Sequence, residues 1–168
     1  MISEAIALTV FPATMAFAAA SDLLTMTIAN RISLLLVAGF GLIAALSGIS
    51  GAILFSHLSA GGAVLAVGFL CFARGWIGGG DAKLAAATAL WLGFAHLFDY
   101  LIYASLFGGA LTLLIIVFRT MPLPAALAGS EWAERLYQAD AGIPYGIALA
   151  AAALVVYPQS EWMGRLAG

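Results

Sequence analysis

Two carboxylates stand out in this sequence because each lies at the border of a long apolar stretch. Asp22 ends the first such stretch, and Asp81 follows three consecutive glycines (78–80) and begins another. A carboxylate at the edge of a membrane segment is costly and is seldom kept without a use. Two carboxylates that can meet are the minimum set for activating a water by general acid and base catalysis. The pair therefore predicts a catalytic site for hydrolysis.

The composition indicates that this chemistry takes place in a membrane. Of the 168 residues, 64% are hydrophobic and only 8% are charged, and the mean hydropathy is +1.10. Soluble domains are about half apolar. Because a helical span needs about 20 apolar residues, the chain has room for about six spans and for no sizeable soluble domain. We expect an all-α, polytopic membrane protein that forms one domain over residues 1–168.

Breaks in the apolar pattern give the bounds of six expected helices. They cover residues 5–24, 32–54, 60–76, 82–97, 99–118 and 144–157. The fourth and fifth are separated only by the short stretch around His96 and Asp99, which predicts antiparallel neighbours joined by a tight turn. The longest connection, 119–143, suits either a short amphipathic helix at the membrane interface or a solvated loop.

The basic residues predict the orientation of these helices. One side of the proposed topology holds five of the six, namely Arg31, Arg74, Lys83, Arg119 and Arg135, and the other side holds Arg165. Cytoplasmic loops collect Lys and Arg. We therefore expect the loops 25–31, 77–81 and 119–143 in the cytoplasm and both termini outside. This topology brings Asp22 and Asp81 to the same, cytoplasmic, membrane border.

Several other classes of protein and site are disfavoured. The net charge of -2 provides no basic surface for nucleic acid. The single cysteine, Cys71, excludes an intrachain disulfide and a thiolate zinc cluster. Because His57 and His96 fall in separate expected loops, we expect no metal site and no cofactor.

Each candidate residue also has a structural alternative. Asp81 could cap the helix that follows it, although this leaves the three glycines unexplained. Asp22 could be a boundary residue in a solvated loop. Lys83 could extend to the lipid headgroups or present its charge to an acidic substrate residue near the pair.

A second functional class is a membrane protein that is not an enzyme. In an ion-coupled transporter or an assembly subunit, the two acids would bind a proton or a cation. Transporter sites usually lie near the bilayer midplane at the interface of repeated halves. The sequence contains no evident repeat, and both acids lie at a membrane border, so the hydrolase is the stronger hypothesis.

Three segments of the chain resemble those of one enzyme family. Residues 78–84 (GGGDAKL), followed by 90–93 (LWLG), closely resemble the second active-site segment of type IV prepilin peptidases, the polytopic Gly-x-Gly-Asp aspartyl proteases. The first active-site segment of that family has an Asp followed six positions later by Ile-Pro-Asn, and here Asp22 is followed by Ile28, Ala29 and Asn30. Ala29 replaces the family's proline. Residues 143–146 (IPYG) resemble the family's C-terminal segment.

The resemblance implies an aspartic endopeptidase that removes the short basic leader of type IV prepilins and pseudopilins. It points to the short branch that serves tight-adherence (Flp-type) pili, acting at the cytoplasmic face of the bacterial inner membrane. The expected partners are the prepilin substrate and the lipid bilayer, and the oligomeric state stays open. Larger members also methylate the new N-terminus and have a domain with paired Cys motifs, which we do not expect here.

The resemblance also implies roles for individual residues. Asp22 and Asp81 would be the catalytic acids, and no metal or other cofactor would be needed. Gly78 and Gly80 would let Asp81 and the substrate backbone approach each other. Lys83 would support the active-site segment, and Pro144 with Tyr145 are candidates for the lining of the cleft.

Overall fold

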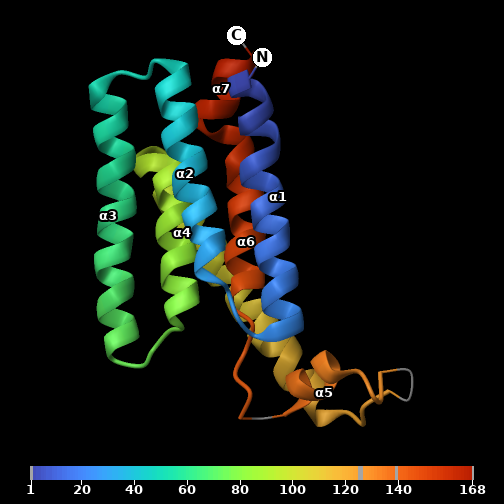
Figure 1. Ribbon diagram of the computed structural model, residues 1–168. Helices are drawn as coiled ribbons and strands as arrows, with labels where there is room; N and C mark the ends of the chain where they lie inside the picture. The colour runs from blue at the N-terminus through green and yellow to red at the C-terminus, as the bar shows by residue number, and fades with distance from the viewer. Residues whose placement is uncertain (1, 125–126, 139, 168) are drawn as a thin grey trace.

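The computed structural model describes residues 2–124, 127–138 and 140–167, and this part of the chain is helical without strands. The elements in order are α1 (Ile2–Thr25), α2 (Asn30–Ser47), α3 (Gly51–Ala73), α4 (Gly79–Thr120), α5 (Glu131–Tyr137), α6 (Gly146–Val156), the 3₁₀ helix η1 (Tyr157–Gln159) and α7 (Glu161–Ala167). Figure 1 shows the long helices side by side in a bundle, with α5 at one end. The expected all-α fold is confirmed.

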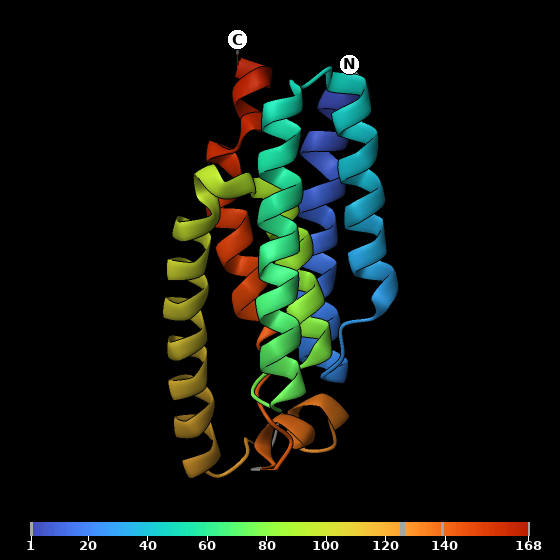
Figure 2. The same cartoon turned by 90° about the vertical axis from the view of Figure 1, so that its left-hand side faces the viewer.

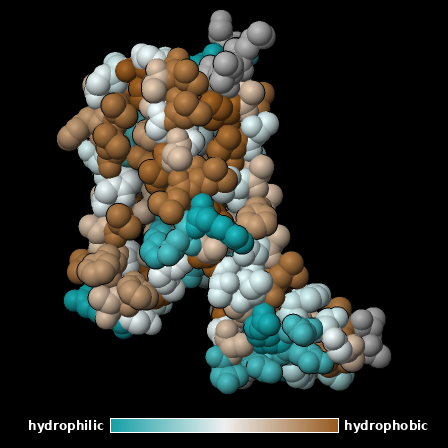
Figure 3. Space-filling model, viewed as in Figure 1, coloured by the Kyte–Doolittle hydropathy of each residue, from teal (hydrophilic) through white to brown (hydrophobic). Residues whose placement is uncertain are grey.

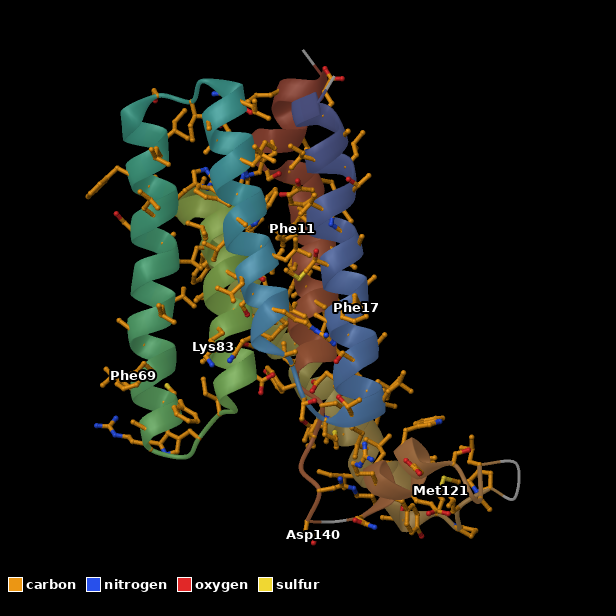
Figure 4. All side chains as sticks on the ribbon, viewed as in Figure 1. Phe11, Phe17, Phe69, Lys83, Met121 and Asp140 are labelled. Atoms are coloured by element: carbon orange, nitrogen blue, oxygen red, sulfur yellow. The ribbon has the colours of Figure 1, made fainter. Side chains whose placement is uncertain are left out.

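Four of the described helices are long and apolar enough to cross a membrane. They are α2, α3, α4 and residues Glu4–Thr25 of α1. Phe17 and Phe69 point away from the bundle and are more than half exposed, whereas Phe11 points inward and is fully buried (Figure 4). Apolar side chains cover most of the helices in Figure 3, and hydrophilic ones form a patch about midway along the bundle and gather around α5. The chain is therefore a multi-pass membrane protein, and the number of six crossings stays a prediction.

The α4 helix contains a reversal of chain direction. Its 42 residues would extend for about 60 Å if straight, roughly twice the thickness of the hydrocarbon core. Gly93 interrupts it with φ 65° and ψ 180°, a conformation that is essentially restricted to glycine. Figure 2 shows the first half (79–92) climbing along the bundle and the second half (94–120) descending beside it. The predicted tight turn is present, but it lies at Gly93 instead of His96 and Asp99.

Two side chains satisfy the carbonyl groups that this break exposes. The last carbonyls of a helix have no helical N–H partner. The His57 ring donates from Nδ1 to the Leu90 carbonyl at 2.8 Å, and Trp162 donates from Nε1 to the Trp91 carbonyl at 2.7 Å. Both side chains are buried. His57 therefore belongs to α3 and to the packing of the break, and its expected place in a loop was wrong.

One other expected boundary also needs correction. The connection between the second and third helices is short and lies at 48–50, not at 55–59. Gly48 ends α2 in the left-handed region, and the Ser50 side chain accepts a hydrogen bond from the Ile53 N–H at the start of α3. The last expected span, 144–157, contains the 11 residues of α6, and the helical path continues through η1 and, after Ser160, through α7.

The ends of the helices divide into two groups. Both termini lie at one end of the bundle, together with the connection between α2 and α3 (Figure 1). The connections from α1 to α2 and from α3 to α4 lie at the opposite end, with α5 beyond them. Asp22 and Asp81 are thereby brought to the same end of the molecule.

The conformation of Gly93 predicts a specific cost of substitution. In Gly93→Ala, an L side chain must adopt a glycine conformation, and its Cβ would lie 3.2 Å from the His57 ring. We expect the free energy of unfolding to fall by about 1–3 kcal/mol, measured by thermal unfolding in detergent. Gly109→Ala is the control because nothing lies within 4 Å of its Cβ. Equal melting temperatures for the two variants would contradict the proposed role of the break.

Candidate active site

Asp22 is buried at the point where α1 meets the start of α6. It lies in the last turn of α1 and is only 5% exposed. The backbone N–H of Gly146, the first residue of α6, donates to its Oδ2 atom at 2.7 Å. An acid is unfavourable at the C-terminus of its own helix but favourable at the N-terminus of another, whose first amides lack partners. The start of α6 therefore supplies the hydrogen-bond donor for the Asp22 carboxylate, which the C-terminal end of α1 cannot provide.

Asp81 is held at the start of α4. Gly78 is the N-cap of this helix, and Asp81 is its third residue. A side chain at this position can reach back to the N-cap amide, and the carboxyl group of Asp81 is hydrogen-bonded to the backbone of Gly78. The alternative that Asp81 itself is the N-cap is therefore wrong, although an acid in the first turn still suits the helix dipole.

The two carboxyl groups line one cavity. Its volume is about 280 Å³. The lining consists of Asp22, Met26, Thr27, Ile28, Gly78, Gly79, Gly80 and Asp81. The charge of Asp22 acts on Asp81 across this space. Because two like charges at close range are unfavourable, we expect the pair to share a proton and to titrate as a unit.

Three glycines allow the chain to close around the acids. A Cβ added to Gly78 would lie 2.8 Å from Asp81 Oδ2, and one added to Gly80 would lie 3.0 Å from the Cβ of Ile28. A Cβ added to Gly146 would lie 2.7 Å from Asp22 Oδ2. Gly78 and Gly80 also line the cavity, and the approach of a substrate backbone to Asp81 beside them stays a prediction. The lack of a side chain at Gly80 lets the start of α4 pack against Ile28.

Lys83 ties the first turns of α4 to the start of α2. Its Nζ atom donates to Asn30 Oδ1 at 2.8 Å. Figure 4 shows Lys83 on the lower part of α4, beside α2. Lys83 also borders an apolar groove of about 290 Å³ between α2, α3 and α4. It therefore lies beside the active-site segment and supports its attachment to α2.

Pro144 and Tyr145 lie beside the cavity and are not part of its lining. Pro144 is fully buried. The Tyr145 hydroxyl donates to the carbonyl of Ala104 at 3.2 Å, and its ring packs directly on Gly108 in the second half of α4. These contacts place the next residue, Gly146, against Asp22. Sequence reasoning missed Gly146 as a site residue, although it belongs to the C-terminal segment that resembles the family.

Two arginines attach the segment around α5 to the acid-bearing end of α1. Arg119, at the end of α4, donates to the carbonyls of Leu136 at 2.9 Å and Gly142 at 2.7 Å. Arg135 donates to the carbonyl of Leu24 in the last turn of α1 at 2.8 Å. Helix C-termini favour basic partners. These residues, which the sequence marked only by their charge, thus hold α5 beside the turn that contains Asp22.

The described residues have no group of three or more His, Cys, Asp or Glu side chains that could hold a metal ion. The chemistry that the arrangement offers is that of two carboxyl groups facing one cavity. One ionised and one protonated carboxyl can together activate a water and polarise a carbonyl.

The close approach of Ile28 to Gly80 can be tested by disulfide formation. The distance of 3.0 Å between the Ile28 Cβ and a Cβ at position 80 is about 0.5 Å below the lower limit of the roughly 3.5–4.5 Å that separates the Cβ atoms of a disulfide. We expect Ile28→Cys/Gly80→Cys, in a Cys71→Ala background, to lose both free thiols on mild oxidation, measured by maleimide labelling and mass. Ile28→Cys/Gly109→Cys should keep them. Free thiols in both variants would contradict the contact.

Comparison with known proteins gives one match. Residues 9–113 match the model of the type IV leader peptidase family, a stretch that covers more than half of the chain and includes both aspartates. No curated protein and no solved structure matches the chain. On the strength of this match, the chain belongs to the type IV leader peptidase family.

Proposed function

We propose that this protein is an aspartic endopeptidase that removes the leader peptide of type IV prepilins and pseudopilins of the tight-adherence (Flp) branch. Its catalytic acids would be Asp22 and Asp81. The observation that carries the proposal is the cavity that these two carboxyl groups share, inside the stretch that matches the leader peptidase family.

The geometry supports a mechanism in which the two acids divide the work. One carboxylate is ionised and takes a proton from a water molecule while the water oxygen attacks the scissile carbonyl carbon. The other carboxyl group is protonated and donates a hydrogen bond to the carbonyl oxygen. The tetrahedral intermediate then loses the amine, which leaves with a proton from the acid pair. The Gly146 amide at 2.7 Å would keep Asp22 in place while its charge changes.

We place this site at the cytoplasmic face of the bacterial inner membrane. The support comes from Arg31, Arg74, Lys83, Arg119 and Arg135, which lie on the segments at the end that contains the two acids. Cytoplasmic segments are enriched in basic residues. A leader that remains in the cytoplasm would reach the cavity from this side, while the apolar helix that follows it lies in the bilayer.

Removal of either acid should abolish processing. In Asp22→Asn or Asp81→Asn, the remaining carboxyl has no acid-base partner, so we expect cleavage of a co-expressed prepilin to fall about a hundredfold or more, measured by gel shift. Asp99→Asn is the control, since Asp99 is an exposed acid on the same α4 helix. Substantial processing by an isosteric variant would remove that residue from the catalytic role.

The proposed mechanism also predicts the response to chelators and pH. Cleavage by purified enzyme should persist in EDTA, because carboxyl groups alone activate the water. Its rate should have a bell-shaped dependence on pH, since the doubly ionised and doubly protonated pairs each lack one of the two roles. A reaction that stops in EDTA and resumes with zinc would rule out this mechanism.

The orientation can be tested by thiol labelling of intact cells. In a Cys71→Ala background, we expect Ser130→Cys, next to α5, to be protected from an impermeant maleimide by the membrane. Ser50→Cys, in the connection at the opposite end, should react from outside. The reverse pattern would contradict a cytoplasmic site.

A further inference from the structure

Ile28 lies where the two acid-bearing segments and the start of α6 meet. It belongs to the connection between α1 and α2 and lines the cavity shared by the acids. Its Cβ faces Gly80 at the start of α4, and its Cδ1 faces Gly146 at the start of α6. The ends of one isoleucine side chain thus touch the two helix starts that hold the carboxyl groups.

Two side chains pack closely against the backbone of Gly146. A Cβ added to Gly146 would lie 2.6 Å from Ile28 Cδ1 and 2.7 Å from Asp22 Oδ2. The carbon of Ile28 and the oxygen of Asp22 therefore both fill the place that a side chain would take. The same backbone residue donates its N–H to that oxygen.

We propose that Ile28 and Gly146 act as one positioning unit that sets the placement of Asp22 relative to Asp81. This inference rests on the proposed peptidase function. Gly146 holds the carboxylate of Asp22 through its amide, and Ile28 keeps the start of α6 at a set distance from the start of α4, where Asp81 is attached. Neither residue exchanges a proton with the substrate. Their role is to keep two groups from different helices in one productive arrangement, for which small displacements are costly.

The coupling between the two residues can be measured with a double-mutant cycle. Gly146→Ala should lower kcat about tenfold or more, because the new methyl group displaces Asp22 and Ile28. Ile28→Val lacks the Cδ1 atom and should change kcat by about threefold or less. The double variant should regain about fivefold over Gly146→Ala, because the methyl group enters the space left by Cδ1. Recovery should be partial, since the methyl group still meets Asp22.

The control pair is Ile28→Val with Gly109→Ala. Gly109 has nothing within 4 Å of an added Cβ, so the two changes should be additive in kcat. The melting temperatures in detergent of all variants provide a second measurement of the contact that does not depend on activity.

The outcomes are distinguishable. A wild-type protein that cleaves no prepilin would overturn the proposed function, while the melting temperatures would still test the contact. Full kcat in Gly146→Ala, or additive effects in both measurements, would overturn the positioning unit. Coupling in melting temperature without coupling in kcat would show that the contact stabilises the fold and positions nothing, which would also overturn it.

Discussion

The hydrogen bond from the Gly146 amide to the Asp22 carboxylate is the interaction on which the rest of the site depends. It joins the end of α1 to the start of α6, two segments separated by most of the chain. The bond pairs an amide at the start of α6, which has no partner within its helix, with a buried carboxylate at the end of α1. Each of the two helix ends thus satisfies a polar group of the other. The bond holds Asp22, which is part of the lining of the cavity, against the start of α6.

The second constraint is the length of the first half of α4. The break at Gly93 limits this half to 79–92, and His57 and Trp162 satisfy the carbonyl groups that the break exposes. The second half then returns along the bundle to meet Tyr145 through the Ala104 carbonyl. The reversal therefore links the start of α4, with Asp81, to the segment that delivers Gly146 to Asp22.

Two arginines attach the segment around α5 to this arrangement. Arg119 and Arg135 hold the α5 segment against the ends of α4 and α1. Arg135 donates to a carbonyl in the turn that contains Asp22, so a basic residue stabilises the end of α1 that carries this acid.

The sequence by itself determined the lipid environment, the helical class, and Asp22 and Asp81 as the candidate acids, because composition and isolated charges in apolar stretches are local properties of the chain. The reversal within α4 could also be predicted, but its position could not, because the polar residues His96 and Asp99 indicated a turn there and Gly93 gave no polar signal. The roles of Ile28 and Gly146 were decided by the tertiary structure alone. Both belong to segments that resemble the family's motifs, but neither carries a group that marks it as part of the site. Their importance comes from close packing and from the hydrogen bond between Gly146 and Asp22, which join segments far apart in the chain.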